Sequence, residues 1–217
     1  MTLAIFDLDN TLIAGDSDHL WGDWLVEKKI VDGEHYQATN DQFYRDYQCG
    51  RLDIMAYLQF SLKVLAEHDM ALLHHWREQF LAEMLDSIWL PKAETLLDKH
   101  RQQGHTLMII TATNDFVTAP IADRLGVEHL IATVAECRRE RYTGRVSGTP
   151  SFRDGKVERL GEWLHQHNET LAGSWFYSDS HNDLPLLRKV DNPVAVDPDA
   201  PLEREALEQG WPVISLR

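Results

Sequence analysis

The feature that most constrains the fold is a short apolar segment near the amino terminus that ends in two aspartates. Residues 2–6 form an apolar run typical of a buried strand, and turn-forming residues follow it at once. Asp7 and Asp9 therefore lie at the carboxyl end of a predicted strand, where open α/β sheets bind their ligands. Two carboxylates held this close repel each other unless a cation or a shared proton compensates them. A divalent cation with oxygen ligands, most simply Mg²⁺, meets that need. An Asx-rich turn that merely closes the strand is the alternative.

A second strand-like segment, residues 106–110, ends in Thr111, Ala112, Thr113 and Asn114. Apolar residues at helical spacing follow, so we expect a strand-to-helix turn here. A hydroxyl group and free backbone N–H groups at such a turn are suited to binding phosphate oxygens. The same residues also suit an amino-terminal helix cap, which is a very frequent arrangement.

Two further polar segments follow in the second half of the chain. Lys156 directly precedes a predicted helix over residues 157–167, where its charge would offset that of a phosphate. Most lysines are simply solvated, so Lys156 is a candidate site residue only because of its position between the other polar segments in the chain. A strand predicted over residues 174–178 ends in Asp179, and Asp183 follows four residues later. A second pair of carboxylates thus arrives at the end of a strand.

Taken in order, these segments resemble the haloacid dehalogenase superfamily of phosphohydrolases. The ordered set is D-L-D-N-T, I-T-A-T, Lys156 and D-S-H-N-D, and the match covers nearly the whole chain. Each motif alone is a weak pattern, but four in the correct order rarely arise by chance. The set is most similar to the branch that contains phosphoserine phosphatase, whose members carry a helical cap between the first and second motifs.

The pattern of helices and strands predicts an α/β protein. Its expected architecture is a Rossmann-like, three-layer core around a parallel sheet, with an inserted all-helical cap domain. Apolar residues recur at helical spacing over residues 14–90, and strand and helix patterns alternate from Pro91 onward, which implies a sheet covered on both faces. We expect residues 1–13 and 91–217 to form the hydrolase core and residues 14–90 to form the cap. The polar stretch 139–148 predicts a hairpin.

The resemblance implies a mechanism and assigns roles to the matched residues. Asp7 is expected to be the nucleophile that forms an aspartyl-phosphate intermediate, and Asp9 to be the general acid and base. Asp7, Asp9 through its main-chain carbonyl, and Asp179 are expected to bind Mg²⁺. Asp183 is expected to orient a metal-bound water or Lys156. The residues expected to hold the phosphoryl oxygens are Leu8, Thr111, Ala112, Lys156 and Asn182.

The expected substrate follows from the cap. In the branch that the chain resembles, an acidic residue nine positions after the nucleophile meets the substrate amine, and Asp16 holds that position. The arginine that binds a serine carboxylate in that branch has no counterpart in the predicted cap helix over residues 53–65. Asp18 and Trp21 would add charge and a stacking surface. Helix capping by the two aspartates and packing of the tryptophan inside the cap are the alternatives.

These features favour an amino-alcohol phosphate that lacks a carboxylate, so we rank histidinol phosphate above phosphoserine as the substrate. Two readings stay open beside this one: a phosphoserine phosphatase, and a phosphotransferase that passes the phosphoryl group to an alcohol acceptor. Carbon–halogen cleavage is disfavoured, because a halide leaves without the proton that Asp9 would supply.

Composition restricts the class of protein and the kinds of partner to be expected. A chain of 217 residues with 43% hydrophobic content can bury one substantial core. The formal net charge of −14 argues against nucleic acid or an anionic membrane as the main partner. No long apolar run or leader pattern is visible, and two cysteines make no disulfide framework, so we expect a cytoplasmic protein. The expected partner is a small phosphomonoester, bound by a monomer or a small homo-oligomer.

Overall fold

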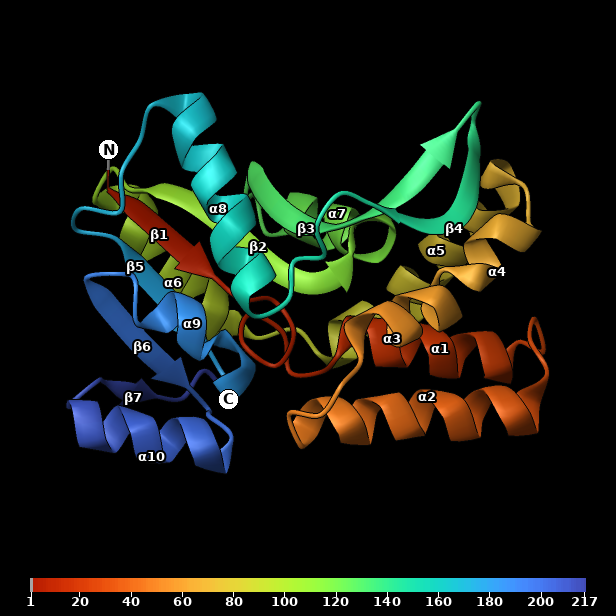
Figure 1. Ribbon diagram of the computed structural model, residues 1–217, viewed down its shortest axis with the longest axis horizontal. Helices are drawn as coiled ribbons and strands as arrows, with labels where there is room; N and C mark the ends of the chain where they lie inside the picture. The colour runs from red at the N-terminus through yellow and green to blue at the C-terminus, as the bar shows by residue number, and fades with distance from the viewer. Residues whose placement is uncertain (1) are drawn as a thin grey trace.

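The computed structural model describes residues 2–217, so Met1, the first residue of the predicted core, lies outside the described part of the chain. Within that part, the centre is a seven-stranded sheet with the strand order β4-β3-β2-β1-β5-β6-β7 (Figure 1). Neighbouring strands are parallel except for β3 and β4. The strands are β1 (Leu3–Phe6), β2 (Thr106–Asn114), β3 (His129–Arg138), β4 (Arg141–Ser147), β5 (Trp175–Ser178), β6 (Asn192–Val196) and β7 (Val213–Ile214).

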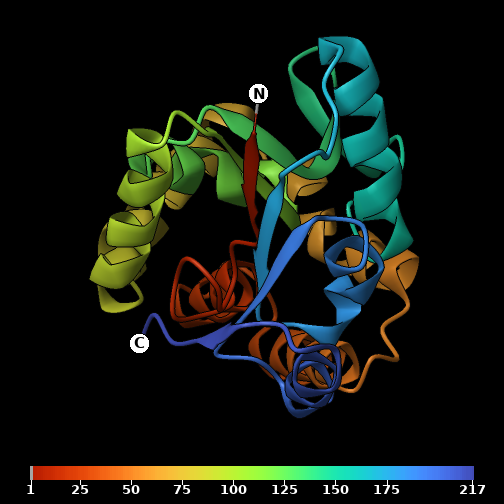
Figure 2. The same cartoon turned by 90° about the vertical axis from the view of Figure 1, so that its left-hand side faces the viewer.

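Helices cover both faces of this sheet. Figure 2 shows α6 (Pro91–Gln102) on one side and α8 (Asp154–His167) on the other. The other core helices are α7 (Asp115–Arg124), the 3-10 turn η2 (His181–Asp183), α9 (Leu184–Leu187) and α10 (Ala200–Gln209). The predicted three-layer α/β architecture is therefore confirmed. None of the helices within residues 2–217 combines the length and the apolar character that crossing a membrane requires.

The central strand β1 shows why the sheet is covered on both faces. All four of its residues are buried, as expected for a strand in a parallel sheet. Because side chains alternate along a strand, Ala4 and Phe6 join one hydrophobic cluster while Leu3 and Ile5 join the other. The sheet thus divides the core into two apolar layers.

A group of helices lies between β1 and β2 in the chain, and we call it the cap. Its members are α1 (Ser17–Glu27), α2 (Gly33–Gln48), α3 (Ile54–Ser61), α4 (Lys63–Glu67) and α5 (Met70–Met84), followed by the 3-10 turn η1 (Leu85–Ser87). These helices gather at one end of the molecule (Figure 1). The chain leaves and re-enters the core along adjacent segments, since the Ala14 N–H donates to the Ile88 carbonyl at 2.7 Å. The predicted all-helical insertion is confirmed.

The predicted hairpin connects β3 to β4. Arg139 and Glu140 at its tip have φ values of 50° and 61°, the pair of left-handed residues that a type I′ turn requires. The strand β4 then contacts α4 of the cap, and a Cβ atom added to Gly144 would lie 3.2 Å from Ala66. The hairpin is confirmed, and it supports the cap instead of standing free in solvent.

Some elements differ from the sequence prediction. The helix expected over residues 53–65 is two helices, α3 and α4, which meet at Leu62. Lys156, expected just before a helix, lies in the first turn of α8, because that helix begins at Asp154. For α6 and α10 no helix was predicted, although each has a proline in its first turn, a common feature of helix starts.

Candidate active site

The carboxyl ends of parallel strands bring the predicted site residues together. The last residue of β1, Phe6, is paired with β2 on one side and with β5 on the other. Asp7 follows β1, Asp179 follows β5, and Thr111 lies near the end of β2. The three motifs therefore meet at one edge of the sheet, as expected for a ligand site in an open α/β sheet.

Lys156 joins two carboxylates in the buried centre of this edge. Its Nζ donates to Oδ1 of Asp7 at 2.7 Å and to the Asp183 carboxylate at 2.8 Å, and all three side chains are more than nine-tenths buried. Burial lowers the pKa of Lys156, but the charges of Asp183 and Asp7 outweigh burial and raise that pKa above its usual value. The ammonium therefore stays charged. Burial also raises the pKa of Asp7, although Lys156 acts in the opposite direction.

Asp9 accepts hydrogen bonds on both of its carboxylate oxygens. The Ser17 N–H, at the start of α1, donates to Oδ1 at 2.7 Å, and Thr113 Oγ1 donates to Oδ2 at 2.8 Å. Burial raises the pKa of Asp9 to about 6, and the charge of Asp16 adds to the shift. A carboxyl group with such a pKa can give up and take back a proton close to neutral pH.

Asp179 is a third carboxylate beside Asp7 and Asp183. Thr11 Oγ1 donates to Asp179 Oδ1 at 3.1 Å and accepts from the Asp179 N–H at 3.1 Å. Burial and the charges of Asp7 and Asp183 raise the pKa of Asp179 well above its usual value. Because the ammonium of Lys156 contacts Asp7 and Asp183 while Asp179 adds a third charge beside them, the group keeps an excess of negative charge. Such a set of oxygen ligands suits a divalent cation such as Mg²⁺.

The predicted phosphate ligands on the first two motifs lie next to these carboxylates. Thr111 Oγ1 lies 3.4 Å from Asp9 Oδ2 and accepts from the Thr113 N–H at 3.2 Å. Ala112 follows Thr111 in the lining of the adjacent pocket. Leu8 is fully buried between the two aspartates of the first motif.

Asn182, another predicted phosphate ligand, is engaged with the cap. Its Nδ2 donates to the Tyr47 carbonyl at 3.2 Å and to Ser180 Oγ at 3.2 Å. Its Oδ1 accepts from Arg153 Nε at 3.0 Å. Arg153 was absent from the predicted site, because the sequence around it indicates only a turn before a helix.

A pocket between the cap and the strand ends opens onto Asp7 and Asp9. It contains about 550 Å³ of space free of atoms, its open mouth included. Within the described part of the chain, its lining contains no lysine and no arginine. The cap contributes an aromatic wall that was absent from the predicted site: Phe43, Tyr44, Tyr47 and Tyr57.

Asp16 and Asp18 both line this pocket, but their oxygens are used differently. Asp16 caps α1, with Oδ1 accepting from the N–H groups of Asp18 and His19 at 3.1 and 2.9 Å. Asp18 Oδ1 accepts from Asn114 Nδ2 at 3.1 Å, whereas Oδ2 is buried without a partner within hydrogen-bond distance among the described residues. Burial raises the pKa of Asp16 to about 6 and that of Asp18 to about 7, although the nearby Tyr57 hydroxyl lowers the latter.

The structure does not bring Trp21 to the pocket. The Trp21 ring stacks on Trp24, with 5.4 Å between the ring centroids, and meets Phe80 and Phe116 edge-on. It is buried inside the cap and is absent from the pocket lining. Only the first turn of α1 faces the pocket, so a residue one turn further along packs against α5 and α7 instead.

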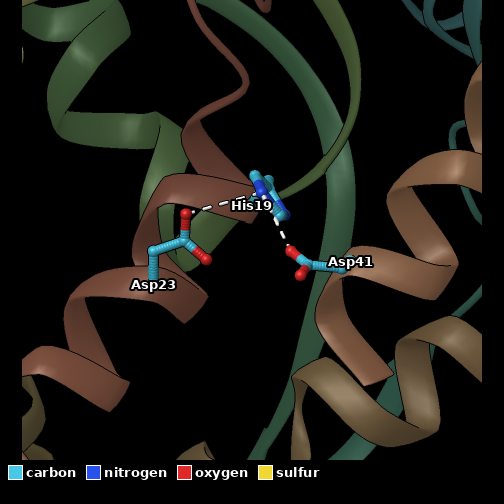
Figure 3. A group of neighbouring side chains, drawn as sticks. All are labelled: His19, Asp23 and Asp41. Carbon is cyan, nitrogen blue, oxygen red and sulfur yellow. Dashed lines mark ion pairs between the residues drawn. The ribbon is translucent and has the colours of Figure 1, made fainter. Parts of the chain in front are cut away.

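A second group of possible metal ligands lies within the cap, at His19, Asp23 and Asp41. Their ligand atoms lie within 4.8 Å of one another, and Figure 3 shows the histidine between the two carboxylates. Gln37 Nε2 already donates to both carboxylates, at 2.8 and 3.1 Å. Asn40 Nδ2 also donates to Asp23, at 3.2 Å. These contacts are a hydrogen-bonded network that joins α1 to α2.

A family model described as haloacid dehalogenase-like hydrolase matches residues 4–188. The chain belongs to this family. The hydrolase is 46% identical over 219 residues to a histidinol-phosphatase of Neisseria meningitidis serogroup C (strain 8013), and the match covers 99% of both chains. Among solved structures it resembles a protein of unknown function from Bordetella pertussis Tohama I, with a TM-score of 0.93 and 42% identity over 100% of both chains.

The hydrolase also shares its fold with a substrate-bound phosphoserine phosphatase. The TM-score is 0.74 at 15% identity, and the match covers 100% of this chain and 93% of that one. At this identity the likeness concerns the fold alone. The family resemblance predicted from the four motifs is confirmed.

Proposed function

We propose that this hydrolase is a Mg²⁺-dependent phosphomonoesterase that acts through an aspartyl-phosphate intermediate and prefers histidinol phosphate. The observation that carries the chemistry is the buried contact of Asp7, Lys156 and Asp183 at the strand ends. An ammonium held against a carboxylate nucleophile offsets the charge of an incoming phosphoryl group, which is the main catalytic work in phosphoryl transfer. In this proposal residues 1–13 and 91–217 are the catalytic core, and residues 14–90 select the substrate.

The two aspartates of the first motif divide the reaction between them. A carboxylate oxygen of Asp7 attacks phosphorus, the P–O ester bond breaks, and the leaving alkoxide takes a proton from Asp9. Asp9 then takes a proton from a water molecule that attacks the same phosphorus, which releases inorganic phosphate and restores Asp7. The hydrogen bonds from Ser17 and Thr113 keep the Asp9 carboxyl group in place for both steps.

The donor set fits Mg²⁺. The residues that would hold it are Asp7, Asp9 through its main-chain carbonyl, and Asp179, with Asp183 orienting Lys156 by direct contact. The raised pKa of Asp179 beside Asp7 and Asp183 supports this assignment, because a bound cation relieves that repulsion. When bound, Mg²⁺ supplies positive charge next to the phosphoryl oxygens.

Donors around the same edge would hold the phosphoryl oxygens. Thr111 offers its hydroxyl group, and Ala112 lies in the last part of β2, close to the amino terminus of α7, where backbone N–H groups favour anions. Leu8 offers its N–H between the two aspartates, and Lys156 its ammonium. Asn182 Nδ2, which donates to Tyr47 and Ser180, would join them by exchanging its bond to Ser180 for one to a phosphoryl oxygen.

The pocket supports a cationic substrate without a carboxylate. Asp16 and Asp18 supply negative charge, and Tyr57 and its aromatic neighbours supply ring surfaces. Among the described residues, the lining contains no lysine or arginine to bind a carboxylate. Histidinol phosphate carries an ammonium and an imidazole ring and has no carboxylate, whereas phosphoserine has one. The relative named histidinol-phosphatase supports the same choice.

The exposed free cysteines, Cys49 and Cys137, suit a reducing compartment such as the cytoplasm.

Phosphate release from a panel of phosphomonoesters tests this proposal. The panel contains histidinol phosphate, phosphoserine, phosphoethanolamine and 4-nitrophenyl phosphate, each with Mg²⁺ and with a chelator. We expect the highest kcat/KM for histidinol phosphate, and loss of activity in the chelator and in Asp7→Asn. Faster hydrolysis of phosphoserine would overturn the substrate assignment, and unchanged activity of Asp7→Asn would overturn the mechanism.

A further inference from the structure

Arg153 occupies a backbone conformation that favours glycine. The Gly155 N–H donates to the Phe152 carbonyl at 2.9 Å, so Arg153 is the second residue of a tight turn. Its φ of 51° and ψ of −120° are those of the first central position of a type II′ turn, which is dominated by glycine. A bulky residue held in such a region points to a role for its side chain.

The side chain of Arg153 joins the fourth motif to the cap. Its Nε donates to Asn182 Oδ1 at 3.0 Å, and its Nη2 donates to the carbonyl of Gly50, just beyond the end of α2. Asn182 in turn donates from Nδ2 to the Tyr47 carbonyl, in the last turn of α2. Two core side chains in mutual contact therefore bind two carbonyl groups of one cap segment.

The cap segment is shaped for this contact. Gly50 has a φ of 67°, and a Cβ atom there would lie 2.5 Å from Nε2 of His181 and 3.3 Å from the Arg153 guanidinium. Carbonyl groups at the carboxyl end of a helix lack partners within the helix and carry partial negative charge. A guanidinium, with its fork of N–H donors, satisfies such carbonyls while remaining charged.

The contact also fixes which way the Asn182 amide faces. An arginine Nε–H can only donate, so the atom of Asn182 that it meets must be the carbonyl oxygen. The amide nitrogen is thereby turned away from Arg153, and the amide cannot flip without losing this bond. The Tyr47 carbonyl, which can only accept, favours the same orientation from the other side of the amide, so Arg153 and the cap segment fix it together.

We propose that Arg153 is a positioning residue that couples cap closure to the phosphate site. It holds the end of α2 on the core and, through the same guanidinium, anchors the Asn182 amide, whose nitrogen would exchange its bond to Ser180 for one to a phosphoryl oxygen. The second half of this inference rests on the proposed phosphatase function, whereas the first half concerns the cap alone.

The backbone conformation supplies a safe test variant. Arg153→Gly removes the guanidinium and places glycine where the turn favours it, so the variant is expected to fold at least as well as the native protein. Arg51→Ala is the matched control. It removes the same charge one residue after Gly50, from a side chain that is exposed.

Amide hydrogen exchange tests the contact with the cap, independently of any activity. In Arg153→Gly we expect exchange of the amides at residues 47–51 to become at least tenfold faster, with exchange in β1 unchanged. Arg51→Ala should leave these rates within about twofold of native. Native exchange rates over residues 47–51 in Arg153→Gly would overturn the proposal.

Kinetics test the coupling to Asn182. On the best substrate of the panel, Arg153→Gly should lower kcat/KM by 10- to 100-fold, and Arg51→Ala by less than twofold. In an Asn182→Ala background the same Arg153→Gly change should cost less than threefold, because the residue acts through that amide. If the losses in kcat/KM of Arg153→Gly and Asn182→Ala multiply in the double variant, the coupling is overturned. A native kcat/KM in Arg153→Gly alone would overturn it too. If the native protein hydrolyses no phosphomonoester, the proposed function fails, and hydrogen exchange alone decides the cap contact.

Discussion

Asn114 donates a hydrogen bond to Asp18 at 3.1 Å, and this bond connects the end of β2 to the first helix of the cap. Asn114 also caps α7 by accepting from the Val117 N–H. The other oxygen of Asp18 is buried without a hydrogen-bond partner among the described residues. Leaving a buried carboxylate oxygen without a partner costs stability, since desolvation is not repaid by a bond. We infer that Asp18 is retained for what it binds.

Replacing Asp18 with asparagine should therefore stabilise the protein and weaken substrate binding. Burial raises the pKa of Asp18 to about 7, whereas the pKa of an aspartate in the unfolded chain is about 3.9. The charged carboxylate therefore lowers the free energy of unfolding increasingly as the pH rises from about 3.9 to about 7. We expect the gain of Asp18→Asn in the free energy of unfolding to be about 2 kcal/mol larger at pH 8 than at pH 5. Urea unfolding in chelator measures this.

The kinetic part of this prediction uses two substrates. Asp18→Asn should raise KM for histidinol phosphate at least tenfold and leave KM for 4-nitrophenyl phosphate nearly unchanged. Asp32→Asn, at an exposed cap aspartate, is the control. An equal rise in KM for both substrates would mean that Asp18 supports the reaction centre and does not bind the part of the substrate that distinguishes the two.

Removing the Lys156 ammonium should destabilise the protein, because Asp7 and Asp183 would then repel each other without compensation. Lys156→Met leaves Asp7 and Asp183 buried without their ammonium, and breaking a buried pair in this way costs about 3–5 kcal/mol. The loss should be smaller at pH 5 than at pH 8, because burial raises the pKa of Asp7 and its carboxyl group can take up a proton as the pH falls. Unfolding of Lys156→Met at the two pH values, with Lys189→Met as the exposed control, measures the difference. A loss independent of pH would contradict this electrostatic account.

The sequence predicted the centre of the site because local patterns and sheet topology suffice there. Asp7 and Asp179 follow strands and Thr111 lies in the second half of β2, and parallel strands carry such residues to one edge whatever else the chain does. The parallel order itself followed from the alternation of strands and helices.

The cap was predicted less well because its contacts depend on how helices orient. Trp21 was expected at the pocket, yet it packs against Trp24 because only the first turn of α1 faces that space. Arg153 was missed since its contact with Gly50 joins segments 103 residues apart. Neither a contact over that sequence separation nor the positive φ of Arg153 can be read from a local sequence pattern. The helix α10 was missed because it is a short surface helix with few buried residues.

A buried histidine should limit stability in mild acid. His100 contacts the Tyr177 hydroxyl at 2.9 Å through Nε2 and His105 at 2.8 Å through Nδ1. Burial, with His105 and Lys99, lowers the pKa of His100 to about 4. Because the unfolded value is about 6.5, the unfolded state takes up the proton first, and stability is lost as the pH falls from about 6.5 to about 4. The full loss is about 3 kcal/mol.

The His100→Gln variant isolates this contribution. It should be less stable than the native protein at pH 7.5, but it should lose about 2 kcal/mol less on going to pH 4.5. His165→Gln, at an exposed histidine, should follow the native profile. Parallel stability curves for native protein and His100→Gln would show that this histidine does not titrate on unfolding.

The leaving group provides the sharpest test of Asp9. An alkoxide needs a proton to depart, whereas 4-nitrophenolate is stable without one, so Asp9→Asn should slow the first step about 10³-fold for histidinol phosphate and much less for 4-nitrophenyl phosphate. The second step needs Asp9 as a base for either substrate. Asp9→Asn should therefore release one equivalent of 4-nitrophenol per enzyme in a burst and then stall with Asp7 phosphorylated. Stopped-flow absorbance measures the burst, and intact-mass analysis detects the added phosphoryl group. Native steady turnover of 4-nitrophenyl phosphate by Asp9→Asn would show that Asp9 transfers no proton in either step.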